Sequence, residues 1–285
     1  MERFSCFLHR FVCFIRQHKW SLFVFFDMTI ISLAAIVLWV DSLPSHWGIP
    51  ILEYHMITEE TDGEEYTYNV PPKDFKEQLE YLQREGYTTI TMQEFMRAKK
   101  GKFELPNKPI ILTFDDGYKN CYTKMLPILE TYNMKATLYM IVNEIGKENY
   151  LTWNELRDMQ ERGVEIGSHT ANHIPLTELS REKQQDEMYL SKLLMEWNGI
   201  HTVFSFSYPN GYYDDEMPAM LKKNEYLNAV TGDPGLNDFN TDPYLMQRVN
   251  IPHPKFGITE FKYRLWKAEF FTKLGIFQHR LNGGF

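Results

Sequence analysis

Short apolar runs alternate with amphipathic segments along most of the chain, from about residue 49 onward. Apolar runs of this length are typical of buried strands, whereas apolar residues that recur every three or four positions indicate helices packed on one face. Strands are predicted at residues 49–55, 110–114, 136–142, 164–168, 203–208, 227–230 and 245–250. Helices are predicted at residues 72–85, 92–100, 119–132, 152–162, 179–197, 214–224 and 260–273.

Strands that are separated by helices favour parallel pairing with right-handed crossovers. The fold class is therefore α/β, and the seven predicted strands indicate a closed or nearly closed barrel. One helix start has its own signature, because Thr152 is followed three residues later by Glu155, which predicts a capping box. In barrels of this kind the functional residues lie at the C-terminal ends of the strands.

An almost continuously apolar stretch at residues 21–40 precedes the barrel pattern. Twenty helical residues span roughly 30 Å, the thickness of the hydrocarbon layer. Trp20 and Trp39 stand where interfacial aromatics are expected, and Asp27 is the one unfavourable residue, at a cost of about 2.5–3.5 kcal/mol if it lay at the centre of a span. A transmembrane helix is predicted, and a buried core helix is the alternative.

Charge around this stretch sets the expected orientation. Basic residues precede it and Asp41 follows it, so the positive-inside rule keeps the N-terminus in the cytoplasm. No convincing cleavage site precedes Asp41, which favours an uncleaved anchor over a removed signal peptide. The expected organisation is a cytoplasmic N-terminus (1–20), a single-pass anchor in the cell membrane (21–40), a linker (41–48) and an extracytoplasmic domain (49–285).

Composition narrows the function classes. With 44% hydrophobic and 24% charged residues, the 285-residue chain is that of an ordinary globular protein. The net charge of −8 argues against nucleic-acid binding and makes strong attraction to an anionic polymer unfavourable. Three cysteines, Cys6, Cys13 and Cys121, form neither a disulfide framework nor a paired metal-ligand spacing.

Two adjacent carboxylates, Asp115 and Asp116, follow the predicted strand at 110–114. On a regular strand consecutive side chains face opposite ways, so both acids can address one site only where the backbone turns, as Gly117 permits. Two like charges so close together are costly unless a cation or a proton lies between them. The alternative is a solvated Asp-Asp-Gly turn.

His169 and His173 follow the strand at 164–168. Residues at i and i+4 share one face of a helical turn, which suits two imidazole ligands of one ion. One carboxylate and two histidines leave a position open on a metal, as in catalytic rather than structural sites. The alternative is a pair of surface histidines.

The segments Thr113-Phe114-Asp115-Asp116-Gly117 and His169-Thr170-Ala171-Asn172-His173 resemble the first two motifs of the family 4 carbohydrate esterases, the polysaccharide deacetylases. The resemblance runs from about Ile49 to Ile251. It implies a distorted (β/α)7-type barrel that hydrolyses N-acetyl groups on an amino-sugar polymer. It also implies that Asp115 is the general base and that Asp116, His169 and His173 bind the metal. Zinc suits this ligand set, and Co2+, Ni2+ or Fe2+ are alternatives.

The segment Ser207-Tyr208-Pro209-Asn210-Gly211 resembles the third motif of the family. The resemblance implies that the backbone N–H of Asn210 helps to hold the oxyanion. The usual arginine two residues before the proline is replaced by Ser207. Arg248, at the end of the last strand, is a candidate to tether Asp115 in its place, and a structural ion pair at the barrel rim is the alternative.

The later motifs of the family, Asp-x-x-Asp-Trp and Leu-x-His, are absent, so the general acid must come from elsewhere. The Tyr54-His55 pair ends the first strand and resembles the biofilm poly-N-acetylglucosamine deacetylases, in which the acid motif stands at the front of the chain. Histidine suits an acid role near neutrality. His55 is the first candidate for the proton donor and His253 the second. Asp233 and Asp238 are candidates for a carboxylate beside His55.

Two function classes therefore remain. The first is a metal-dependent N-deacetylase of a cell-surface polysaccharide, most simply poly-β-1,6-N-acetylglucosamine, with peptidoglycan or chitin oligomers as alternative substrates. The second is a catalytically idle barrel that binds glycan or organises a synthesis complex. The expected partners are an N-acetylated polysaccharide, the membrane through the N-terminal helix and the exopolysaccharide synthesis machinery.

Overall fold

The computed structural model describes residues 19–43, 48–59 and 67–275, and side chains from residue 27 onward. The chain divides into two compact units, residues 1–45 and 46–285. The predicted cytoplasmic segment before residue 19 and half of the predicted linker, residues 44–47, lie outside the described residues.

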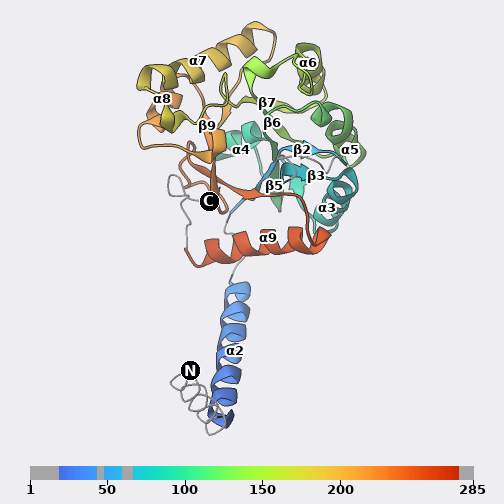
Figure 1. Cartoon of the computed structure of the whole chain (residues 1–285), viewed down its shortest axis with the longest axis vertical. Coiled ribbons are helices and arrows are strands. Elements are labelled where there is room, and N and C mark those ends of the chain that lie inside the picture. The colour runs from blue at the N-terminus through green and yellow to red at the C-terminus, as the bar shows by residue number, and fades with distance from the viewer. Residues whose placement is uncertain (1–18, 44–47, 60–66, 276–285) are drawn as a thin grey trace, which may run out of the picture. The chain divides into compact units, whose positions relative to one another are not determined.

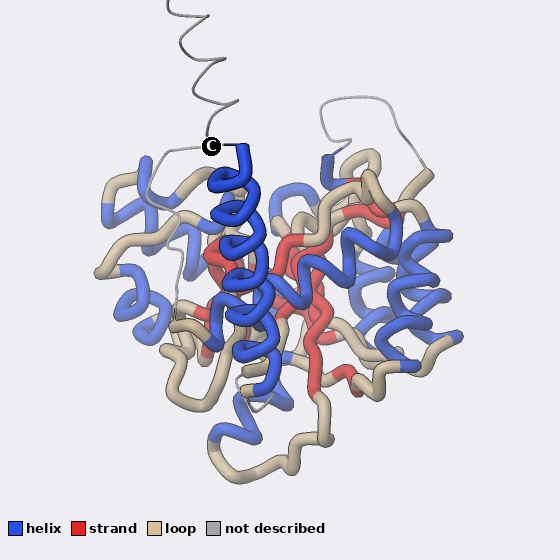
Figure 2. Tube along the Cα trace, turned by 90° about the horizontal axis from the view of Figure 1, so that it is seen from below, coloured by secondary structure: helices blue, strands red, loops and turns tan. Residues whose placement is uncertain are grey.

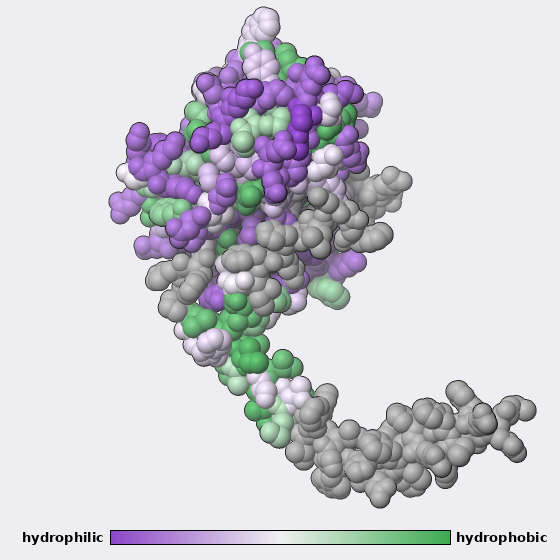
Figure 3. Space-filling model, turned by 90° about the vertical axis from the view of Figure 1, so that its left-hand side faces the viewer, coloured by the Kyte–Doolittle hydropathy of each residue, from purple (hydrophilic) through white to green (hydrophobic). Residues whose placement is uncertain are grey.

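The first unit contributes one described helix, α2 (Lys19–Ser42). Several of its large apolar side chains are exposed, including Met28, Ile31 and Leu38, and hydrophobic atoms gather on it (Figure 3). Among the residues that the structure describes, however, no helix combines the length and the apolar character that a membrane crossing requires. The transmembrane segment predicted at 21–40 is therefore not confirmed.

The second unit is built around a ring of parallel strands, with helices outside it (Figures 1 and 2). Strand β1 pairs with both β10 and β5, which closes the ring. The seven strands of the ring are β1 (Ile51–Tyr54), β5 (Pro109–Phe114), β6 (Thr137–Met140), β7 (Glu165–Ser168), β8 (Ser205–Ser207), β9 (Asn228–Pro234) and β10 (Met246–Asn250). The predicted seven-stranded α/β barrel is thus confirmed.

Three short strands lie beside the ring. β4 (Thr88–Thr89) pairs with the start of β5, and β2 (Met56–Ile57) pairs with β3 (Asn69–Val70). The helices are α3 (Pro72–Arg84), α4 (Met92–Lys99), α5 (Leu126–Thr131), α6 (Trp153–Glu161), α7 (Arg181–Trp197), α8 (Met217–Lys223) and α9 (Gly257–Lys273). The capping box predicted from Thr152 and Glu155 is present at the start of α6.

Two of the helix boundaries that differ from the prediction do so for clear local reasons. The helix predicted from residue 119 begins with a π-helical turn, Cys121–Met125, before α5. Pro127 has no N–H to donate within the helix, and the Leu126 N–H reaches back five residues to the carbonyl of Cys121. The helix predicted from Asp214 begins at Met217, because the Asp214 carboxylate accepts from the N–H groups of Glu216 and Met217 as a turn does.

Side chains of the strands alternate between two apolar clusters. Ile51 and Ile111 point into the barrel, whereas Leu52 and Leu112 pack outward against the helices. The same alternation sends Glu53 and Asp115 toward the inside of the barrel at the C-terminal ends of their strands. The strand period therefore decides which acidic groups are buried together.

Candidate active site

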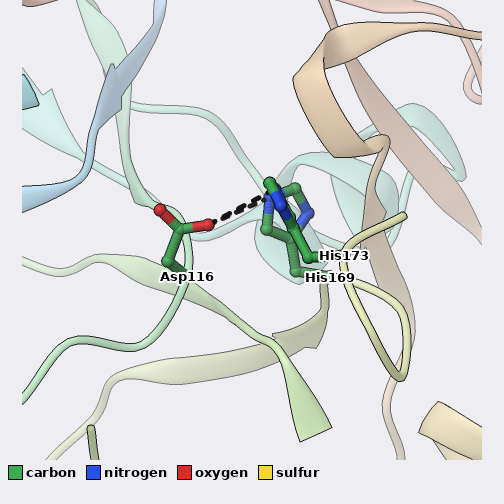
Figure 4. A group of neighbouring side chains, drawn as sticks. All are labelled: Asp116, His169 and His173. Atoms are coloured by element: carbon green, nitrogen blue, oxygen red, sulfur yellow. Dashed lines mark ion pairs between the residues drawn. The ribbon is translucent and has the colours of Figure 1, made fainter. Parts of the chain in front are cut away.

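Asp116, His169 and His173 converge at the C-terminal ends of β5 and β7 (Figure 4). Oδ1 of Asp116 lies 3.5 Å from Nε2 of His169 and 3.5 Å from Nε2 of His173. This oxygen is buried and, among the described residues, has no hydrogen-bond partner. A buried carboxylate oxygen left unpaired beside two imidazole lone pairs is the arrangement that a divalent metal ion completes. The three residues therefore fit the metal ligand set that the sequence predicts.

A left-handed backbone turn separates the two adjacent carboxylates. Asp116 has a φ of 71° and Gly117 a φ of 82°. A Cβ at residue 117 would lie 2.0 Å from Sδ of Met140, so only glycine fits there. The chain thus leaves the strand at Asp116 itself, and both carboxylates reach one site although a regular strand would part them.

The two histidines do not share a helical turn, so that part of the prediction is wrong. Residues 169–175 form an irregular loop in which Thr170 and His173 have positive φ. The N–H groups of the loop bond to side chains instead of helical carbonyls: the Glu187 carboxylate on α7 accepts from Ala171 and Asn172, and the Thr170 hydroxyl accepts from His173. These bonds fold the loop back and bring both imidazoles to the same side.

The tautomer of His169 is fixed by its neighbour on β8. Its Nδ1 lies 2.8 Å from the carbonyl oxygen of Ser207, which can only accept, so Nδ1 carries the proton and Nε2 presents a lone pair toward Asp116. Burial, together with the proximity of His169, lowers the pKa of His173 to about 4. Both imidazoles are thus suited to bind a metal in the neutral form.

Asp115 is held by Arg248 in a buried ion pair. Nη1 of Arg248 donates to Oδ1 of Asp115 and Nη2 lies by Oδ2, both at 2.9 Å, and the side chains are 1% and 2% exposed. The Ser207 hydroxyl donates to the same carboxylate at 3.1 Å. Burial alone would raise the pKa of Asp115, but the charge of Arg248 outweighs it and holds that pKa well below its usual range. The carboxylate is therefore kept ionised, as a proton acceptor must be.

His55 stands close to Asp115, at the end of β1. Atoms of His55, Asp115 and Glu53 that could bind a metal lie within 4.8 Å of one another. The carboxylates near His55 are thus Glu53 and Asp115. Asp238, one predicted neighbour, accepts hydrogen bonds within its own turn, and Asp233, the other, accepts one from Tyr213.

The remaining candidates occupy nearby loops. Asn210 follows β8 in a short 3-10 turn with φ 56°, and its side chain is exposed. His253, after β10, has its Nδ1 3.1 Å from the carbonyl oxygen of Asn69 and its N–H bonded to Thr67. This second candidate for the proton donor is engaged in holding the segment at residues 67–69.

Three residues of the site were not predicted in these roles. Ser207 contacts both Asp115 and His169, Glu53 contacts Arg248, and Glu187 holds the histidine loop. Glu53 had a visible signal, because a charged residue in an otherwise apolar strand needs a buried partner. Ser207 also had a signal, because it stands where the third motif of the family has an arginine. Glu187 had none, since a polar residue on a helix is ordinarily solvated.

Taken together, the residues form a candidate metal-ligand triad, an ionised carboxylate beside it and a histidine near that carboxylate. Such an arrangement can activate water and move protons at one reacting carbon.

Comparison with known proteins also indicates a hydrolytic enzyme. A family model described as polysaccharide deacetylase matches residues 102–229. YxkH of Bacillus subtilis (strain 168), named for the same family, is 34% identical over 204 residues, which cover 71% of each chain. The poly-β-1,6-N-acetyl-D-glucosamine N-deacetylase of Staphylococcus epidermidis is 27% identical over 209 residues, 66% of this chain and 70% of that protein.

A solved structure shares the fold. The Streptococcus pyogenes deacetylase PplD, in complex with acetate, superposes with a TM-score of 0.70 at 28% identity and covers 78% of this chain and 98% of that one. The candidate metal triad, the buried base-like aspartate and these matches agree on one assignment. The chain belongs to the polysaccharide deacetylase family, hydrolases that act on the amide bonds of N-acetylated sugars.

Proposed function

We propose that this protein removes N-acetyl groups from poly-β-1,6-N-acetylglucosamine and that its metal is zinc. The observation that carries the proposal is the unpaired Oδ1 of Asp116, which faces two histidines beside the ionised Asp115. The substrate is suggested by several relatives named for it, at 25–27% identity. Zinc is the ordinary ion for a carboxylate and two imidazoles with an open position.

A divalent metal held by Asp116, His169 and His173 would polarise the acetyl carbonyl and lower the pKa of a bound water. The other steps fall to residues of the chain. Asp115, held ionised by Arg248, accepts the proton of the attacking water. The N–H of Asn210 would donate to the developing oxyanion. His55 would donate a proton to the sugar nitrogen as the C–N bond breaks, because an amine anion is a poor leaving group.

The donor role of His55 separates two kinds of substrate. Amide cleavage needs a proton on the leaving nitrogen, whereas an aryl acetate with a good leaving group does not. The variant His55→Ala should keep its metal and lose about 10²- to 10⁴-fold in turnover of the amide, with a much smaller loss on the ester. Equal losses on both substrates would remove His55 from the donor role and make His253 the next residue to test.

The substrate is tested directly with the full-length protein. Acetate release should be greatest with poly-β-1,6-N-acetylglucosamine, smaller with chitin oligomers and peptidoglycan, and abolished by a chelator. Greater release from peptidoglycan or chitin oligomers would reassign the substrate. Glycan binding without release from any of the three would support the catalytically idle barrel.

We also propose that the domain acts on the outer side of the cell membrane, near the machinery that makes the polymer. The exposed apolar side chains of α2 and the basic residues that precede it support this location. Protease added to intact cells should digest the domain beyond Asp41. Protection in intact cells, with digestion after lysis, would refute the location.

A further inference from the structure

Glu53 is a buried acid at the seam where the barrel closes. It lies on β1, between β5, which leads to Asp115, and β10, which carries Arg248. Its register partners are Thr113 on one side and Asn250 on the other. The side chain points into the barrel and is almost fully buried. A carboxylate in this position needs a compensating charge and is costly to retain for stability alone.

Arg248 is that compensating charge, and it is shared. Its Nη2 lies 3.1 Å from Oε1 of Glu53 and 2.9 Å from Oδ2 of Asp115, while its Nε donates to the carbonyl of Thr231. One guanidinium thus faces two buried carboxylates, and the cluster carries a surplus of negative charge. A second metal ion among Glu53, His55 and Asp115 is disfavoured, because Arg248 already supplies a cation there.

The carboxylates of Asp115 and Glu53 differ in how many of their oxygens contact Arg248. Both oxygens of Asp115 are engaged by Arg248, and Oδ2 also accepts from Ser207. The contact of Glu53 with Arg248 uses Oε1, so Oε2 lies outside that ion pair. A ring nitrogen of His55 and a carboxylate oxygen of Glu53 lie within 4.8 Å of each other, so the two groups are neighbours. Hydrogen bonds between catalytic groups are often long before substrate binds and shorten in the complex.

We propose that Glu53 is a positioning residue for His55. The Glu53 carboxylate accepts a hydrogen bond from one imidazole nitrogen of His55 and so directs the other nitrogen toward the leaving nitrogen of the substrate. This rests on the proposed donor role of His55. In the step, the C–N bond breaks and its electron pair stays on nitrogen. The proton of His55 forms the new N–H bond, while Asp115 holds the proton taken from water. Glu53 itself touches neither substrate nor metal.

The test is Glu53→Gln, assayed on an N-acetylated glucosamine oligomer and on an activated aryl acetate. Glutamine keeps the shape and an oxygen for Arg248 but removes the charge. Amide turnover should fall about 10- to 100-fold, by analogy with the hydrogen-bond partners of metal-binding histidines, while ester turnover and metal content stay unchanged. The retained ester rate shows that the variant is folded. The matched control is Glu165→Gln, at a glutamate with a buried Oε1 at the start of β7, and it should leave both rates unchanged.

A double-mutant cycle separates positioning from a structural role. Added to His55→Ala, the Glu53→Gln change should cost nothing further, because its effect passes through the histidine. Three results would overturn the inference. An equal loss of amide and ester turnover in Glu53→Gln would show that Glu53 acts through Arg248 and Asp115. The other two are an unchanged amide rate in Glu53→Gln and a full additional loss in the double variant. A wild-type protein that releases no acetate from any amide would sink the proposed function itself, and the role of Glu53 with it.

Discussion

Glu165 provides a direct test of the electrostatics inside the barrel. It lies at the start of β7, at the opposite end of that strand from His169. Its Oε2 accepts from the Gln93 N–H at 2.8 Å, whereas Oε1 is buried and has no hydrogen-bond partner among the described residues. The residue as a whole is only half-buried, but the burial of the oxygen governs its ionisation. Burial raises the pKa of Glu165 to about 7. The hydrogen bonds from Gln93 and from the Thr91 and Thr137 hydroxyls lower this pKa, but by less than burial raises it.

The raised pKa fixes the sign of the pH dependence. The folded protein binds this proton more tightly than the unfolded chain, so the contribution to stability is complete below about pH 4.5 and is lost as the pH rises through about 7. At about 1.4 kcal/mol for each pH unit between these two pKa values, the loss amounts to at most about 3 kcal/mol. Glutamine has no charge to bury, so Glu165→Gln should not lose this stability.

The assay is urea denaturation of both proteins between pH 5 and pH 8. The free energy of unfolding of Glu165→Gln, relative to wild type, should increase across this range by up to about 3 kcal/mol. Glu130→Gln is the control, because Glu130 is a surface residue whose pKa is lowered by its hydrogen bond with Arg162. Parallel curves for wild type and Glu165→Gln would show that Glu165 ionises as in water and that solvent reaches Oε1.

Three further substitutions test the site. His173→Ala should lose bound metal and activity together, as measured by metal analysis of the purified variant; full metal occupancy would refute its role as a ligand. Asp115→Asn should keep its metal and lose at least about 10²-fold in turnover, the lower end for general base catalysis, and loss of metal would make Asp115 a ligand instead. Arg248→Met should cost about 3–5 kcal/mol in urea denaturation, because Asp115 and Glu53 would be left buried without a cation. The surface variant Arg162→Met should cost at most about 1 kcal/mol, and a similar cost for both would contradict this reasoning.

The barrel was predictable because its strands are short apolar runs buried on both faces. Ile110, Ile111 and Leu112 show this pattern, and the structure buries all three, two outward and one inward. Boundaries were less predictable because single side chains move them, as Asp214 does at α8 and Pro127 at α5. Such local effects depend on which backbone groups a side chain contacts, and the periodicity of apolar residues in the sequence does not predict these contacts.

The candidate metal ligands and the tether of Asp115 by Arg248 were predicted from the sequence, but the contacts that Glu53 and Ser207 make with these residues were not. Arg248 lies 133 residues from Asp115 and 195 from Glu53, and closure of the barrel alone brings the three together. The same closure places Ser207 against both Asp115 and His169. Sequence patterns report neighbours along one element, whereas these contacts join the ends of different strands.

The different surroundings of Asp115 and Asp116 depend on one backbone angle. Asp115 continues the inward alternation of β5 and therefore meets Arg248 inside the barrel. Had the strand continued, Asp116 would have pointed outward among apolar side chains. The left-handed turn at φ 71° instead directs it over the strand end toward the two histidines, where no arginine of the described part of the chain pairs with it. Asp115 thus has a fixed cation from the chain and is suited to accept a proton. Asp116 has an unpaired oxygen and is suited to bind a metal cation from outside the chain.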